Sequence, residues 1–160
     1  GEGKPGYITF KTLDVSSYQN GTVKVEMLMG ASTESNSRYE TADYIKIEYA
    51  FDSDIATGAG TSGSIPDQAN LETGNYSIGG AFYGGVGATG SDYFLDTDLD
   101  GVGNADGVSL TTTLTDQSFT FSVPATAGKV SVRIVAIGNS AEEAVVDNVR
   151  IVILLIFSLL

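Results

Sequence analysis

The segment Thr22-Val-Lys-Val-Glu-Met-Leu-Met29 decides the fold class, because apolar side chains occupy every second position from Val23 onward. Successive side chains of a β-strand point to opposite faces, so this pattern predicts a strand with one buried and one solvated face. The same period of two recurs at residues 44–51, 119–123 and 129–137, and no segment sustains a helical period over three turns. The sequence therefore predicts an all-β protein built as an antiparallel two-sheet β-sandwich.

These segments also predict which side chains meet the core and which meet water. Ser131 and Arg133 alternate with apolar residues, so we expect them on a solvated face, as we do Lys46 and Glu48. The stretch 79–90 has too many glycines for a regular strand interior and is expected to form loops and bulges. The expected core side chains are Val23, Val25, Met27, Met29, Ile45, Ile47, Tyr49, Phe51, Phe119, Phe121, Val123, Val130, Val132, Ile134 and Ala136.

Length and composition narrow the class of protein. The chain has 160 residues, the length of one domain, and we expect a single sandwich over residues 1–150. It contains no cysteine and no histidine, which excludes thiol nucleophiles, histidine-based triads and the usual transition-metal sites. Eight basic against twenty acidic residues give a formal net charge of -12. Nucleic acid and anionic membranes are poor partners for such a surface.

One loop has a spacing that predicts a chemistry: residues 96–106 read Asp-Thr-Asp-Leu-Asp-Gly-Val-Gly-Asn-Ala-Asp. Alternate aspartates followed by a glycine that can take a tight turn are typical of loops that bind a hard cation such as calcium. A helix-loop-helix calcium site is not expected, since its twelfth position needs Glu and is here Gly107. The alternative is a solvated acidic turn. The expected ligands are Asp96, Asp98, Asp100, Asn104 and Asp106.

The segment 151–160, Ile-Val-Ile-Leu-Leu-Ile-Phe-Ser-Leu-Leu, abandons alternation for a nearly unbroken apolar run. Ten residues in a helix span roughly 15 Å, half of a bilayer core, so we expect no membrane span in the segment as it stands. Three interpretations remain open: a central core strand, the start of a membrane anchor, or a strand donated to a neighbouring subunit of a homo-oligomer or polymer. In the last case, the contact residues would be Ile151, Ile153, Leu155, Phe157 and Leu159.

Three stretches together, residues 43–52, 96–106 and 139–151, resemble a family of bacterial extracellular jelly-roll domains with a calcium loop. These domains are similar to concanavalin-like, MAM-like and carbohydrate-binding modules, and the resemblance covers roughly residues 8–152. It implies a jelly-roll sandwich at the cell surface or outside the cell. It also implies that Asp147 helps to hold a structural calcium, with Glu142 or Glu143 as a further ligand.

The residues favour a binding protein over an enzyme. Glu142 and Glu143 are adjacent, so in a strand they would point to opposite faces and could not flank one glycosidic bond. We therefore predict a non-catalytic, calcium-stabilised extracellular protein that self-assembles through its tail, as a structural or adhesive subunit of a surface layer, fibre or filament. The alternative is a calcium-dependent carbohydrate-binding module; the chain has no tryptophan, so the sugar would stack on Tyr83 or Tyr93.

Overall fold

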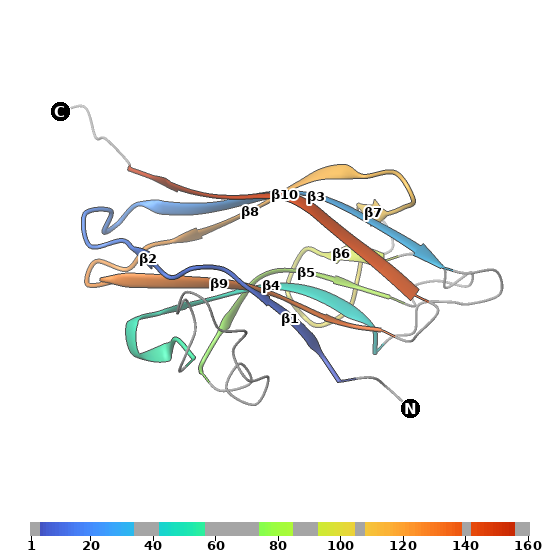
Figure 1. Cartoon of the computed structure of the whole chain (residues 1–160), viewed down its shortest axis with the longest axis horizontal. Helices are drawn as coiled ribbons and strands as arrows, with labels where there is room; N and C mark the ends of the chain where they lie inside the picture. The colour runs from blue at the N-terminus through green and yellow to red at the C-terminus, as the bar shows by residue number, and fades with distance from the viewer. Residues whose placement is uncertain are drawn as a thin grey trace.

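The computed structural model of the chain forms two β-sheets that pack face to face (Figure 1). All strand pairings in the described part of the chain are antiparallel. The predicted all-β, two-sheet sandwich is therefore confirmed, whereas the jelly-roll connectivity stays a prediction. The residues that the structure describes are 4–33, 42–56, 74–84, 93–104, 108–138 and 142–155.

The larger sheet has the strand order β1-β9-β4-β5-β6-β7, with β2 also paired to β9, and the smaller sheet has the order β10-β3-β8. A short 3₁₀ turn, η1 (Asp52–Asp54), follows β4. The strands of the larger sheet are β1 (Gly6–Thr9), β2 (Leu13–Asp14), β4 (Tyr44–Phe51), β5 (Ser77–Tyr83), β6 (Tyr93–Asp96), β7 (Ser109–Leu110) and β9 (Lys129–Ile137). Those of the smaller sheet are β3 (Thr22–Thr33), β8 (Thr115–Ser122) and β10 (Glu142–Leu154).

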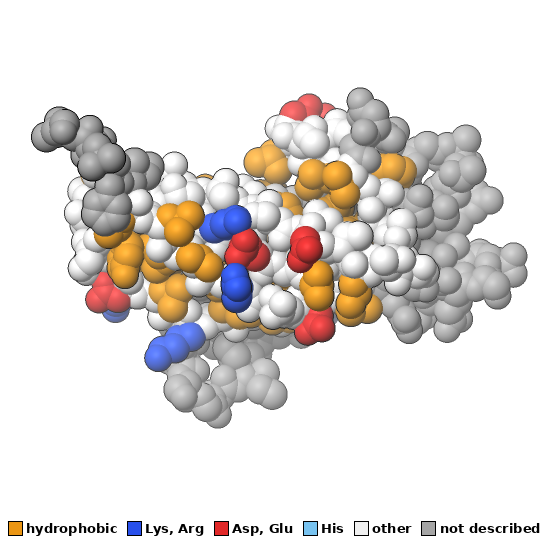
Figure 2. Space-filling model, turned by 90° about the horizontal axis from the view of Figure 1, so that it is seen from above, with side chains coloured by type: hydrophobic (Ala, Val, Ile, Leu, Met, Phe, Trp, Pro, Cys, Tyr) orange, Lys and Arg blue, Asp and Glu red, His pale blue; other side chains and the backbone are white. Residues whose placement is uncertain are grey.

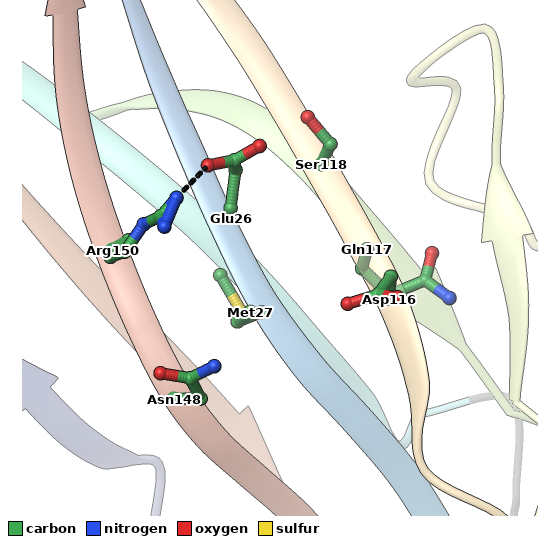
Figure 3. A pocket seen from close by; sticks show the side chains of 7 residues that line it. All are labelled: Glu26, Met27, Asp116, Gln117, Ser118, Asn148 and Arg150. Atoms are coloured by element: carbon green, nitrogen blue, oxygen red, sulfur yellow. Dashed lines mark hydrogen bonds and ion pairs between the residues drawn. The ribbon is translucent and has the colours of Figure 1, made fainter.

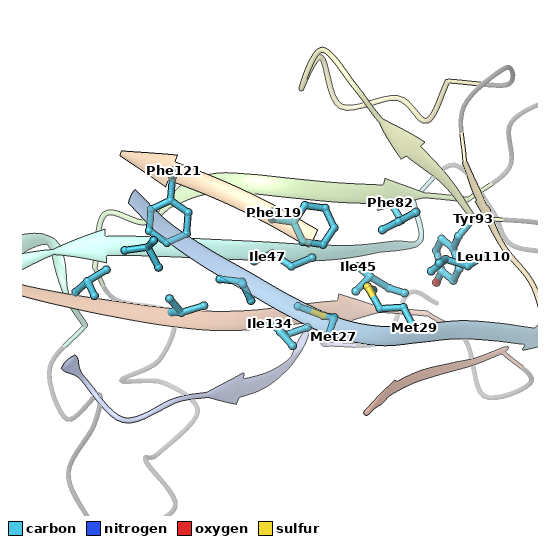
Figure 4. Packing of buried hydrophobic residues seen from close by; sticks show 14 of the residues in the cluster. Met27, Met29, Ile45, Ile47, Phe82, Tyr93, Leu110, Phe119, Phe121 and Ile134 are labelled. Carbon is cyan, nitrogen blue, oxygen red and sulfur yellow. The ribbon is translucent and has the colours of Figure 1, made fainter. Parts of the chain in front are cut away.

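The core lies between the two sheets and is formed by the faces that alternation predicted. On β3, the central strand of the smaller sheet, the four predicted core side chains are each at most 3% exposed. They pack against Ile45 and Ile47 of β4, both fully buried, and against the ring of Phe119 (Figure 4). Tyr49 stacks on Phe121 with ring centroids 3.8 Å apart, which joins the two sheets at one end of the core.

The prediction that β9 has a solvated face is wrong, because Ser131 and Arg133 are 0% and 7% exposed. The Tyr76 side chain covers them: its hydroxyl donates to Ser131 Oγ at 3.1 Å, and its ring centroid lies 3.7 Å from the Arg133 guanidinium carbon. Arg133 Nε also donates to Glu48 Oε2 at 2.7 Å. Strand β9 is thus covered on both faces. The charge of Arg133 can be buried there because it is paired with that of Glu48.

The expectation of loops at residues 79–90 is wrong for its first part, since Gly79 and Gly80 lie inside β5. The predicted bulge is present: the β4–β5 register shifts between Ile47 and Glu48, which leaves Gly79 without a partner. A Cβ on Gly80 would collide with the Phe119 ring of the opposite sheet, so glycine is needed there for close packing. Gly84 follows β5 as a bend, and residues 85–90 lie outside the described part.

Strand β10 continues without interruption from Glu142 to Leu154, across the predicted boundary at residue 150. It pairs with β3 over this length, with a register shift between Asp147 and Arg150. Ile151 and Ile153 pack against the core. Among the described strands, β10 lies at the edge of its sheet, so the interpretation as a central strand is wrong for residues 151–154. Residues 156–160, which include the predicted contact residues Phe157 and Leu159, lie outside the described part. None of the described residues forms a helix that is long and apolar enough to cross a membrane.

We expect Gly80→Ala to destabilise the protein by roughly 1–3 kcal/mol, because the added methyl group forces the Phe119 ring out of its packed position. The matched control is Gly6→Ala, whose Cβ would have its nearest neighbour, the Ala136 carbonyl oxygen, at 3.9 Å. Urea unfolding followed by circular dichroism measures both changes. Equal effects at the two positions would contradict the close approach of the sheets at Gly80.

We expect Glu48→Ala to lower the free energy of unfolding by about 3–5 kcal/mol, since it leaves the Arg133 charge buried without its partner. The control is Glu26→Ala, which breaks an ion pair with Arg150, a side chain that is 67% exposed, and should cost far less. Thermal unfolding of the two variants tests this difference. A similar loss in both would show that the Arg133 charge is solvated.

Candidate metal site

The predicted cation loop begins where β6 ends, at Asp96. This carboxylate is only 3% exposed, and its two oxygens accept hydrogen bonds from the backbone N–H groups of Asp100 (3.3 Å) and Gly101 (3.0 Å). The loop doubles back because Leu99 and Gly101 take left-handed conformations, with φ of 59° and 93°. Asp96 therefore holds the turn in place and presents its carboxylate from a fixed position.

The turn brings three carboxylates together. One oxygen from each of Asp96, Asp98 and Asp100 lies within 4.8 Å of the other two, and the latter two side chains are exposed. Hard cations such as calcium bind carboxylate oxygens in this way, and without a cation the like charges repel. The cluster is the only group of this kind within the described residues. It fits a divalent cation that is held from the solvent side.

Asn104 closes the loop from its other end, and its side chain has a different role from the predicted one. Its Oδ1 accepts hydrogen bonds from the backbone N–H and the hydroxyl of Thr97, both at 2.7 Å. These two bonds occupy both lone pairs of the amide oxygen, so this oxygen is engaged in the loop itself. Asp106, the last predicted ligand, lies outside the described residues.

Asp147, which the resemblance assigned to calcium, lies on β10 of the smaller sheet and is exposed. Its Oδ1 accepts a hydrogen bond from the backbone N–H of Asn148 at 2.7 Å, at a bulge where Asn148 has φ of 51°. It is not part of the described carboxylate cluster. The side chains of Glu142 and Glu143 lie outside the described part of the structure.

The two tyrosines proposed for sugar stacking are buried, with 8% of Tyr83 and 2% of Tyr93 exposed. Tyr93 belongs to the core, and its hydroxyl donates to the Ile137 carbonyl at 3.4 Å. Burial raises the pKa of the Tyr83 phenol, and the negative charge of Asp96 raises this pKa further. Neither ring offers an open face, so the tyrosines do not form the predicted stacking platform.

A polar hollow of about 240 Å³ lies on the outer face of the smaller sheet (Figure 3). Across it, Arg150 Nη2 donates to Glu26 Oε2 at 3.3 Å. Sequence analysis missed this hollow because these two residues are 124 positions apart and no local motif connects them. The lining residues are Glu26, Met27, Asp116, Gln117, Ser118, Asn148 and Arg150.

A second hollow, of about 310 Å³, adjoins the carboxylate cluster. Asp96 and Leu99 contribute to it from the loop, and Phe119 closes it from β8. The Asp96 end of the cluster therefore borders a hollow that is partly lined by apolar side chains.

Comparisons of the chain with models of protein families, with curated protein sequences and with solved structures found no match. The class of the protein is therefore defined by its own fold and site: a two-sheet β-sandwich with a carboxylate cluster in the loop after β6. The resemblance to bacterial jelly-roll domains stays a prediction.

We expect calcium to raise the melting temperature of the chain, and Asp98→Asn together with Asp100→Asn to remove this effect. At a calcium concentration 100 times Kd, the lost stabilisation would be about 2.7 kcal/mol. Asn at position 100 can still accept the hydrogen bond from the Val102 N–H, so the turn is preserved. In excess chelator, the double variant should be at least as stable as the parent, because fewer like charges repel.

Asp116→Asn is the control, since this residue is exposed on β8 and lies outside the cluster. It should leave the calcium-dependent rise in melting temperature unchanged. The cation site would be refuted if calcium did not change the melting temperature of the parent chain. It would also be refuted if the double variant lost equal stability with calcium and with chelator.

Proposed function

We propose that the chain is a non-catalytic, calcium-stabilised subunit of an extracellular assembly, such as a surface layer, fibre or filament. The observation that carries this proposal is the edge strand β10. It is 13 residues long, pairs with β3 along one side and leads directly into the apolar segment 155–160. An edge strand presents unpaired backbone N–H and C=O groups, which is the usual template for pairing with another chain.

The side chains of β10 also favour contact with another protein surface. Val145, Leu154 and Leu155 are 45%, 45% and 44% exposed, although they are apolar. Figure 2 shows hydrophobic side chains on either side of a central group of charged residues on this face of the molecule. Leu154 and Leu155 mark one end of β10 and Val145 the other, so apolar surface is available at both ends of the strand. Exposed apolar residues that join into a contiguous patch often mark an interaction surface.

Calcium has a structural part in this proposal. A bound calcium ion offsets two of the three negative charges of Asp96, Asp98 and Asp100 and so fixes the loop between β6 and β7. A loop with few carboxylates and an open solvent side suits weak calcium binding, which is effective where calcium is about millimolar, outside cells. A lower negative charge also reduces the repulsion between copies that each have a formal net charge of -12.

We expect the purified chain to form large polymers in millimolar calcium, and deletion of residues 156–160 to abolish them. This deletion leaves Ile151 and Ile153 in the core, so the domain should remain folded. Light scattering measures the mass with calcium and with excess chelator, and circular dichroism checks the fold. A parent chain that is monomeric in both conditions would refute the assembly function.

A calcium-dependent carbohydrate-binding module is the second candidate, and the polar hollow of Figure 3 favours it. Carboxylate, amide, hydroxyl and guanidinium groups line this hollow, and such groups hydrogen-bond to sugar hydroxyls. The described residues that line it include no aromatic side chain on which a sugar ring could stack. We therefore rank this function below assembly. A monomeric chain with calcium-stabilised folding would favour it.

A further inference from the structure

An apolar groove of about 450 Å³ opens between the edge strands of the two sheets, on the side where β1 and β10 lie. Ile45 and Ile134, which are 0% and 2% exposed, contribute core side chains to it. Ile8 of β1 and Val145 of β10 are its exposed apolar residues, at 52% and 45%. Among the described residues, no charged side chain lines the groove; the lining residues are Gly6, Tyr7, Ile8, Ile45, Ile134, Ala136, Ala144, Val145 and Val146.

The volume and the borders of this groove suit an apolar segment. Its volume lies in the usual range of ligand pockets, roughly 300–1,000 Å³. Among the described strands, β1 pairs with β9 and β10 pairs with β3, so each is the terminal strand of its sheet. A strand that enters here can therefore add to an open sheet edge while its side chains reach the core.

Resting on the assembly function proposed above, we infer that the groove binds residues 155–160 of a second copy of this chain. This segment reads Leu-Ile-Phe-Ser-Leu-Leu and is apolar throughout except for Ser158. The segment has no charged side chain, and neither do the described residues that line the groove, so the contact brings no like charges together between two acidic proteins.

The same segment of one copy is too short to fill that copy's own groove. Val145 pairs with Gly30 and Leu154 with Thr22, so the groove and the exit of the segment lie toward opposite ends of β10. Nine residues of strand separate them, about 30 Å, whereas six extended residues reach about 20 Å. Figure 1 shows the end of β10 at one end of the sandwich and β1 toward the other.

Contact between the tail of one copy and the groove of the next is heterologous, and the pair that it joins still has one free groove and one free tail. Such a contact adds copies without limit unless the rotation closes a ring, so it produces a filament. This inference deepens the proposed function, because it names the acceptor surface and the polarity of the assembly.

A complementation experiment tests the inference on the full chain in millimolar calcium. Val145→Asp places a charge in the groove, and the double variant Phe157→Asp with Leu159→Asp places charges in the tail. For each variant alone, we expect light scattering to give the mass of the monomer, 16.6 kDa. An equimolar mixture should form a dimer of twice that mass, because one intact groove meets one intact tail.

Two controls keep the result interpretable. Val108→Asp changes a residue that is 51% exposed and does not line the groove, so this variant should polymerise like the parent. Ile8→Asp is a second groove variant, to be used if Val145→Asp fails to give the circular dichroism spectrum of the parent. Both groove variants are expected to have the same phenotype.

The outcomes separate this inference from the proposed function. A monomeric parent refutes both. A parent that polymerises while folded Val145→Asp also polymerises refutes the groove as acceptor but leaves assembly standing. If the mixture of blocked variants stays monomeric, the contact is not between tail and groove. Binding of a small apolar ligand to the groove without any loss of polymer on Val145→Asp would likewise overturn the inference.

Discussion

The whole fold depends on the burial of one face of β3. This strand is the centre of the smaller sheet and pairs with both β10 and β8, and the side chains of one of its faces belong to the core between the two sheets. Val23, Val25 and Met29 are completely buried there. A shift of one residue in register would turn this face to water and bury Lys24 and Glu26. The cost of that exchange fixes the register of the entire smaller sheet.

Close approach of the sheets sets where polar groups can go. Gly80 allows the Phe119 ring to lie directly against β5, and the bulge at Gly79 accommodates the extra residue. On the outer side of the larger sheet, Arg133 is enclosed between Glu48 and Tyr76. The protein therefore has a second buried layer over β9, held by a charge pair and not by apolar packing alone.

The candidate site and the proposed interface lie at different parts of the sandwich. The carboxylate cluster follows β6 in the larger sheet, whereas the apolar groove lies between β1 and β10. A cation at the cluster can thus stabilise a subunit without competing for the surface that would join subunits. The described lining of the groove has no charged side chain, which matters because each copy has a formal net charge of -12.

The sequence by itself determined the β class, four strands, the inner faces and the loop in which Asp96, Asp98 and Asp100 converge. These features depend on side-chain period and local spacing, which a chain displays before it folds. Only the tertiary structure decided that Arg133 is buried, that Asn104 closes its own loop, that Tyr83 is enclosed and that β10 is an edge strand. The physical reason is that burial and strand order depend on residues far apart in the chain, such as Tyr76 over Ser131, and no local pattern encodes those partners.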